Sequence, residues 1–147
     1  MKIKTMAAVA VLAGFGLLAG AAEVKINTTE VGGRLVDDIA LPFVNDPAVL
    51  GEWVSVDFVS EPGQFVPAAK QFEDTLYLKG LTFKTGGGMS VPWFTWTSGV
   101  VMHSGDKTAA RYAIKTIEGA QYMFFEWKSG DYVIRHQKPQ YYVLKKK

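Results

Sequence analysis

The segment Leu50–Val59, Leu-Gly-Glu-Trp-Val-Ser-Val-Asp-Phe-Val, places the strongest constraint on how this chain can fold. Its side chains alternate with period two, and its β-branched and aromatic residues are those that a pleated sheet favours. Trp53 and Asp57 therefore fall on one face of the predicted strand, and Phe58 on the other. Gly51 lets the chain turn sharply into this strand. The segment predicts a first strand whose tryptophan either plugs one end of a barrel or is an ordinary core residue.

Further alternating segments follow, separated by short turns rich in glycine. No segment has the periodicity of a helix longer than a turn or two. Evenly spaced strands with tight turns predict an all-β domain, either an antiparallel up-and-down barrel of about eight strands or a sandwich. Both faces of segment 121–128 are apolar, so we expect this strand to be central in the sheet or covered on both sides. The expected strands are 50–59, 75–83, 91–103, 108–116, 121–128, 132–136 and 141–144.

Residues 1–22 have the features of a secretory signal peptide. Lys2 and Lys4 precede the apolar run 6–18, and the small residues 19–21 follow it. An uncleaved membrane anchor is the alternative, although the run is shorter than the roughly 20 residues that a span requires. We therefore expect export to the periplasm or the extracellular space, with a fold that contains no cysteine and relies on its core alone.

The remaining chain divides into an N-terminal arm, residues 23–42, and a barrel domain, residues 43–147. Asp46 and Pro47 predict a capped helical turn just before the first strand. Segment 60–71 contains two prolines and a glycine, and we expect a long loop that forms a mouth or a lid.

Charge excludes one class of partner. The chain has 16 basic and 14 acidic residues, and two lysines leave with the signal peptide, so the mature chain has 14 of each. No basic surface for nucleic acid is expected.

Few residues have the chemistry of a catalytic or metal site. The chain has two histidines, His103 and His136, and no cysteine to complete a metal site. Ser104, His103 and Asp106 contain the groups of a catalytic triad, but no nucleophile elbow accompanies them. We expect no metal, no cofactor and no enzymatic activity.

Asp57 is the polar residue of greatest interest, because the alternation places it beside Trp53 inside the barrel. A buried carboxylate needs a partner, and Arg111, Arg135 or Lys128 can supply one. Such a pair either closes the barrel or offers a polar anchor to a ligand.

A barrel of about eight strands has room for one small ligand, and aromatic residues make up 13% of the chain. Most of these aromatics are expected to be core residues. The expected lining of a ligand cavity is Asp57, Trp93, Trp96, Arg111, Tyr112, Tyr122, Phe125 and Trp127.

The start Gly51-x-Trp53, the turn Gly130-Asp131-Tyr132 and an arginine on a late strand together resemble the lipocalins, or calycins. The resemblance implies a barrel closed at one end by Gly51, Trp53 and an arginine packed across the tryptophan. Arg135 matches that arginine, with Arg111 as the competitor. No helix is evident after the last strand, which places the chain outside the typical family.

The chain is also similar, over about residues 43–146, to an exported bacterial family. The similarity rests on Phe-Val-Asn-Asp-Pro at 43–47, Leu-Gly-x-Trp at 50–53, Glu-Trp-Lys-Ser-Gly-Asp-Tyr at 126–132 and Tyr-Tyr-Val-Leu-Lys-Lys at 141–146. Some members of that family occur beside domains of penicillin-sensing signal transducers. The resemblance implies no particular activity.

Two functions remain open. The first is an exported protein that binds a small, mainly apolar molecule or lipid in a barrel cavity. The alternative is a protein-interaction or sensory accessory module with a filled barrel. An open cavity lined by aromatic residues favours the first, and a lumen filled by side chains favours the second. The sequence indicates neither the oligomeric state nor which face of each strand lines the lumen.

The signal peptide generates the first testable prediction. Because small residues follow the apolar run, the mature protein is expected to begin at Ala22 or Glu23. Mass analysis of the intact protein from the cell envelope measures this start, and a chain that retains Met1 there would indicate an anchor instead.

Overall fold

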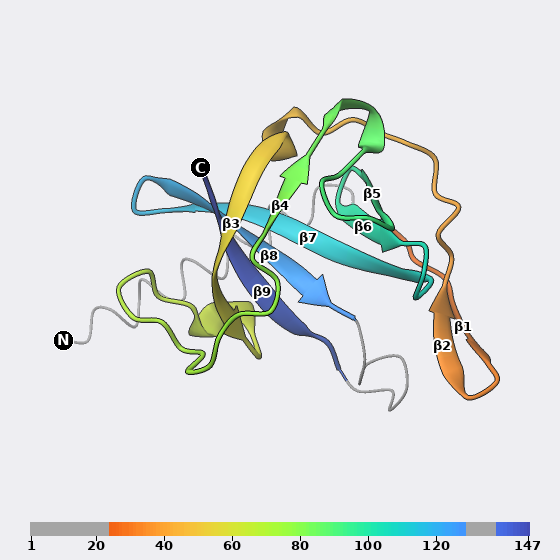
Figure 1. Cartoon of the computed structure of the whole chain (residues 1–147), viewed down its shortest axis with the longest axis horizontal. Helices are drawn as coiled ribbons and strands as arrows, with labels where there is room; N and C mark the ends of the chain where they lie inside the picture. Colours follow the sequence, from red (N-terminus) through yellow and green to blue (C-terminus); the bar gives the residue numbers. More distant parts are fainter. Residues whose placement is uncertain (1–23, 129–137) are drawn as a thin grey trace.

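The computed structural model describes residues 24–128 and 138–147, and Figure 1 shows their arrangement. Seven strands form one antiparallel sheet in the order β4-β3-β9-β8-β7-β6-β5, which curls into a nearly closed barrel. The prediction of an all-β, up-and-down barrel is confirmed, with seven strands among the described residues; the expected strand 132–136 lies outside them. The barrel strands are β3 (Gly51–Val59), β4 (Gly80–Phe83), β5 (Phe94–Thr97), β6 (Val100–His103), β7 (Thr108–Ile117), β8 (Ala120–Trp127) and β9 (Gln140–Lys146).

The barrel is interrupted only between β4 and β5, and the number of strands explains why. All neighbouring strands are antiparallel, so β4 and β5 run in the same direction and cannot form an antiparallel pair. Residues 88–90 occupy this gap, after the short 3₁₀ helix η3 (Thr85–Gly87). Antiparallel bridges join Met89 to Phe83 and Gly88 to Thr95. This short segment therefore takes the place of an eighth strand in the barrel.

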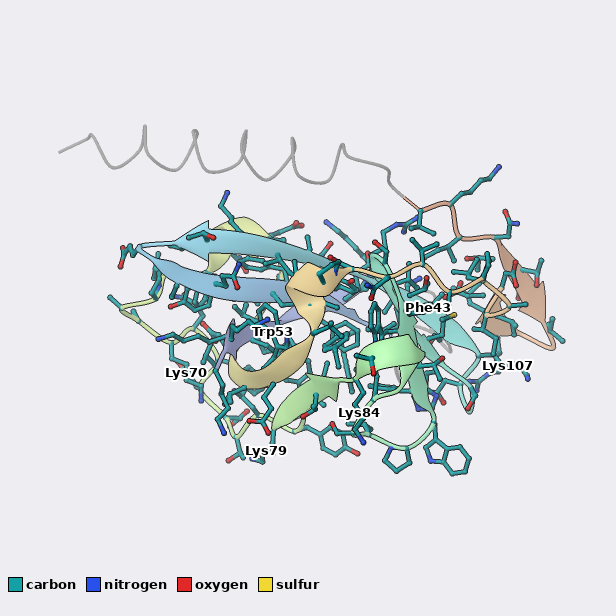
Figure 2. The ribbon with its side chains drawn as sticks, turned by 90° about the horizontal axis from the view of Figure 1, so that it is seen from above. Phe43, Trp53, Lys70, Lys79, Lys84 and Lys107 are labelled. Carbon is teal, nitrogen blue, oxygen red and sulfur yellow. The ribbon has the colours of Figure 1, made fainter. Side chains whose placement is uncertain are left out.

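Trp53 fills the lumen near one end and is only 1% exposed (Figure 2). Its indole Nε1 donates to the carbonyl of Val49 at 2.8 Å, in the 3₁₀ helix η1 (Pro47–Val49), which Asp46 caps as predicted. Between the paired strands β3 and β4, a Cβ on Gly80 would lie 2.6 Å from the carbonyl oxygen of Trp53. Only glycine permits the strands to approach this closely.

The cation over the Trp53 ring is Lys146, whose Nζ lies 5.1 Å from the ring centroid. The same ammonium donates to the carbonyl of Leu50 at 2.7 Å. Lys146 thus takes the position that the lipocalin resemblance gives to an arginine. Arg135 lies outside the described residues, and Arg111 is elsewhere, with its guanidinium donating to the carbonyl of Val24 at 3.0 Å.

A β-bulge in β3 reverses the predicted direction of Asp57. Ser55 pairs with Leu144 and Asp57 with Val143, so Val56 is an extra residue between them. After such a bulge, even spacing no longer keeps side chains on one face. Asp57 is fully buried, as predicted, but it lies on the outer face, whereas Trp53 points into the lumen. The prediction that the two share a face is wrong.

The predicted ion pair between Asp57 and Arg111 is also wrong. The carboxylate of Asp57 accepts hydrogen bonds from three backbone amides instead, those of Phe58, Gln71 and Phe72, at 2.8, 2.8 and 2.9 Å. Backbone donors can satisfy a buried carboxylate as well as a cation does. Asp57 therefore fastens the end of the 60–71 loop to the outside of the barrel.

That loop covers the side of the barrel, not its opening. It contains the 3₁₀ helix η2 (Pro62–Gln64), and Phe65 packs against Tyr122 and Phe124 with ring centroids 4.9 and 6.0 Å apart. The expectation of a mouth or lid at 60–71 is wrong, because the apolar outer face of β8 requires a cover. The prediction that β8 is covered on both sides is confirmed.

The N-terminal arm contains an ordered hairpin, β1 (Thr28–Val31) and β2 (Arg34–Asp37), which projects from one end of the molecule (Figure 1). Asp37 is buried and accepts hydrogen bonds from Thr28, from the amide of Ala109 and from Lys128 Nζ at 3.1 Å. Lys128 is therefore the partner of Asp37, not of Asp57. This buried pair ties the arm to β7 and β8.

Two strand predictions differ from the structure. The expected strand 75–83 is a strand only from Gly80, and residues 75–79 are irregular. The expected strand 91–103 is a hairpin of β5 and β6, with Gly99 in the turn at a φ of 82°. Within the described part of the chain, no helix has the length and hydrophobicity to cross a bilayer.

The position of Asp57 generates a stability prediction. In Asp57→Asn, one carboxylate oxygen becomes an amide donor that faces backbone N–H groups, so the free energy of unfolding should fall by about 2 kcal/mol. Urea unfolding followed by circular dichroism measures the change. Asp74→Asn, at an exposed position of the neighbouring segment, is the matched control and should be neutral. A neutral Asp57→Asn would show that these hydrogen bonds contribute little to stability.

Candidate functional site

An aromatic basin of about 580 Å³ opens at one side of the barrel. Its walls come from the irregular segment before β4, the segment entering β5, and the last residues of β6 and β8. Sequence-distant elements therefore meet here because the barrel brings their ends together. The basin is lined by Tyr77, Leu78, Val91, Pro92, Trp93, Phe94, His103, Asp106 and Trp127.

Trp93 is the most unusual residue of the basin. Its side chain is 69% exposed, although exposing a large apolar side chain is unfavourable. Its φ is 75°, a left-handed conformation that is a genuine outlier for a bulky residue. The backbone is held there by Ser104, whose amide donates to the carbonyl of Trp93 at 2.8 Å. Strained residues of this kind cluster at binding sites.

Tyr77 and Trp127 form the opposite wall. Tyr77 is 82% exposed, and its ring meets that of Trp127 with centroids 6.2 Å apart and planes inclined at 61°. Trp127 rests on Tyr142 and Phe125, with centroids 5.0 and 6.2 Å away. The Tyr142 hydroxyl also accepts from the amide of Leu78 at 3.1 Å. The wall is therefore supported from the lumen, while its outer rings remain accessible.

The polar side of the basin consists of His103 and Asp106. His103 Nδ1 accepts from the amide of Asp106 at 2.8 Å, so the neutral ring carries its proton on Nε2. The Asp106 carboxylate lies 3.8 Å from Arg34 of the hairpin. The hydroxyl of Ser104 donates to the carbonyl of Trp93 at 3.3 Å. A catalytic triad would require this hydroxyl to contact His103, but it is directed at the backbone instead.

A second depression, of about 670 Å³, lies between β3 and residues 70–79, with Lys70 and Lys79 on its rim (Figure 2). It is larger but lacks aromatic side chains, and its acidic and basic residues are exposed. Ser55 Oγ borders it and has no hydrogen-bond partner within the described residues. The hydroxyl oxygen is buried, so Ser55 offers the depression no accessible polar atom. We regard the aromatic basin as the better candidate site.

The structure places three of the predicted lining residues at or beneath the basin. Trp93 and Trp127 line it, and Phe125 lies below Trp127. Trp96 and Tyr112 instead fill the lumen. The Trp96 indole donates to the carbonyl of Lys84 at 2.8 Å. These two residues close the barrel interior.

The phenol of Tyr112 donates to the carboxylate of Asp46 at 2.7 Å. Burial raises the pKa of Tyr112 well above its ordinary value, so the hydroxyl remains a neutral donor and ties β7 to the turn before β3.

The other three predicted lining residues face away from the lumen. Asp57 and Tyr122 lie under the 60–71 loop, and Arg111 faces the N-terminal arm. Their assignment to the lumen is wrong. Gly51, assigned to barrel closure, has a φ of 111° at the start of β3, a conformation that side chains rarely adopt.

The sequence analysis did not place Tyr77, Phe94, His103 or Asp106 at a common site. Tyr77 and His103 were expected on the strands 75–83 and 91–103, and His103 and Asp106 were grouped only as members of a possible triad with Ser104. The Pro92-Trp93 pair just before β5 was the available signal, because a proline favours an irregular or edge position and can place the following tryptophan outside the sheet.

No group of three or more histidine or acidic residues within 24–128 and 138–147 is arranged to hold a metal ion. Comparison of the chain with protein-family models, curated proteins and solved structures finds no match.

The strained backbone of Trp93 generates a prediction. Trp93→Gly relieves a left-handed backbone conformation that costs about 1–2 kcal/mol. The greater backbone entropy that glycine loses on folding offsets about 0.5–1 kcal/mol of this gain. We expect the free energy of unfolding to stay constant or rise by up to about 1 kcal/mol, measured by urea unfolding. Lys107→Gly, at another exposed position with a φ of 56°, is the matched control. A marked loss of stability in Trp93→Gly alone would show that the indole has a structural role.

Proposed function

We propose that this protein is an exported binding protein that takes a small, mainly apolar ligand in the aromatic basin. The observation that carries the proposal is Trp93, which combines an exposed indole with a strained backbone. Neither property stabilises the free protein, so we infer that both serve binding. Concave sites with aromatic walls and a few polar groups are the usual form of small-molecule sites.

The ligand is proposed to bind at the basin and not deep inside the barrel. The lumen is occupied by the core cluster around Trp53, Trp96 and Met123. A recess of about 10 Å³ borders the basin at Phe94 and Trp127 and is too small to hold a ligand. A ligand would therefore cover Trp127 without displacing the core.

Export and family membership are part of the proposal and rest on the sequence features described above. The second candidate function is a protein-interaction or sensory accessory module, which the filled lumen favours. In that case Trp93 and Tyr77 would contact a protein partner. Binding of a small probe distinguishes the two functions.

The test uses N-phenyl-1-naphthylamine, a neutral apolar fluorophore. We expect its fluorescence to rise on addition of the mature protein, with saturation at micromolar concentrations. Trp93→Gly removes one wall of the basin, which should weaken binding about tenfold, because stacking and burial of one aromatic ring contribute on the order of 1–2 kcal/mol.

Lys107→Gly is the control, since it removes an exposed side chain at a similar backbone conformation outside the basin. Its affinity for the fluorophore should equal that of the unaltered protein. If both variants bind the fluorophore as the unaltered protein does, the basin is not its binding site. If the fluorophore does not bind at all, the preference for a neutral apolar ligand is contradicted, and the interaction module becomes the better account where no other small molecule binds.

A further inference from the structure

We propose that the ligand of the aromatic basin is an organic cation, a quaternary or tertiary ammonium group on a small apolar body. This inference rests on the proposed function and specifies the chemistry of the same site. It follows from three properties of the basin: the number of its aromatic rings, the sign of the charges on its wall, and the small number of its hydrogen-bonding groups.

The aromatic rings provide the first argument. Three electron-rich rings, those of Tyr77, Trp93 and Trp127, border the basin. Tyr77 and Trp127 are inclined at 61° with centroids 6.2 Å apart, so they form a corner and not a flat stack. A cation within about 6 Å of such rings is attracted by their negative faces, and aromatic cages of this kind bind quaternary ammonium groups.

The charges provide the second argument. Asp106 is the only residue of the described basin wall with a full negative charge, and no lysine or arginine lines the wall. The Asp106 side chain is 34% exposed, and its two carboxylate oxygens lie 3.8 Å from Arg34 and 4.0 Å from His103 Nδ1. An anionic ligand would meet a carboxylate and aromatic faces, both of which repel it. A cation would be attracted by both.

The hydrogen-bonding groups provide the third argument, against a sugar. Exposed tryptophan and tyrosine rings can stack on sugars, but a sugar has many hydroxyl groups that need partners when they lose water. Hydrogen-bonding side chains on the wall are limited to those of Tyr77, Trp93, Trp127, His103 and Asp106. A methylated ammonium group has few or no hydrogen bonds to satisfy, so it suits a wall of rings with one carboxylate.

The experiment compares choline with 3,3-dimethyl-1-butanol, which has the same shape but a carbon in place of the charged nitrogen. Binding of each to the mature protein is measured directly by NMR titration and by displacement of N-phenyl-1-naphthylamine. We expect choline to bind about tenfold more tightly than the neutral alcohol, in line with a cation–π attraction. The anion 3,3-dimethylbutanoate should bind more weakly than either.

Two matched variants locate the charge effect. Asp106→Asn should weaken choline binding about three- to tenfold. Asp38→Asn removes the same charge at an exposed position of the arm, outside the basin, and should leave choline affinity unchanged. Equal losses in both variants would indicate a general charge effect and would overturn the assignment to the basin.

The outcomes separate this inference from the proposed function. If the fluorophore binds but choline and the alcohol compete equally, the cation preference is wrong and the small-ligand function stands. The fluorophore can also fail to bind while choline binds. If Trp93→Gly then abolishes choline binding, the cation site stands and the preference for neutral apolar ligands is wrong. If choline shows no chemical-shift change in the NMR titration, the inference fails whatever the fluorophore does.

Discussion

The extra residue in β3 is the constraint on which the rest of the structure depends. Before the bulge, Trp53 enters the lumen and closes one end of the barrel; after it, Asp57 turns outward and holds the 60–71 loop through three backbone amides. One strand therefore organises both the inner and the outer apolar layers. A regular strand would have directed Asp57 into the lumen, where a carboxylate would need a partner among aromatic side chains.

The odd number of strands determines where the barrel is weak. With all neighbours antiparallel, β4 and β5 run in the same direction, and residues 88–90 join them only by isolated bridges. The segments that precede β4 and β5, residues 75–79 and 91–93, lie outside the regular strands. They carry Tyr77 and Trp93, so the interruption in the sheet is also the place where aromatic rings become accessible.

The aromatic residues of the molecule divide between a buried core and an accessible basin. Trp53 and Trp96 are buried, and each donates its indole hydrogen to a backbone carbonyl. Trp93 is exposed in a strained conformation, and Trp127 is half-buried between the core and the basin. The rigid lumen supports the basin from below, because Phe125 and Tyr142 pack against Trp127. A filled barrel can in this way present a binding site at its edge without an internal cavity.

The sequence by itself determined the all-β class, the up-and-down order of strands, the capped turn at Asp46 and the burial of Trp53. These follow from local rules: period-two alternation, turn residues and capping chemistry act over a few neighbours and are visible in the chain. It also selected Trp93 and Trp127, which line the aromatic basin.

Only the tertiary structure decided which face each strand presents and which residues meet. The bulge at Val56 has no local signal, because it is set by pairing with β9, far along the chain. It turns Asp57 outward, whereas the Arg111 guanidinium donates to the carbonyl of Val24 in the arm. The association of Lys128 with Asp37, and of Tyr77 with His103 and Asp106, likewise depends on contacts between distant segments. Alternation defines two faces of a strand, but only packing against other elements determines which one is inside.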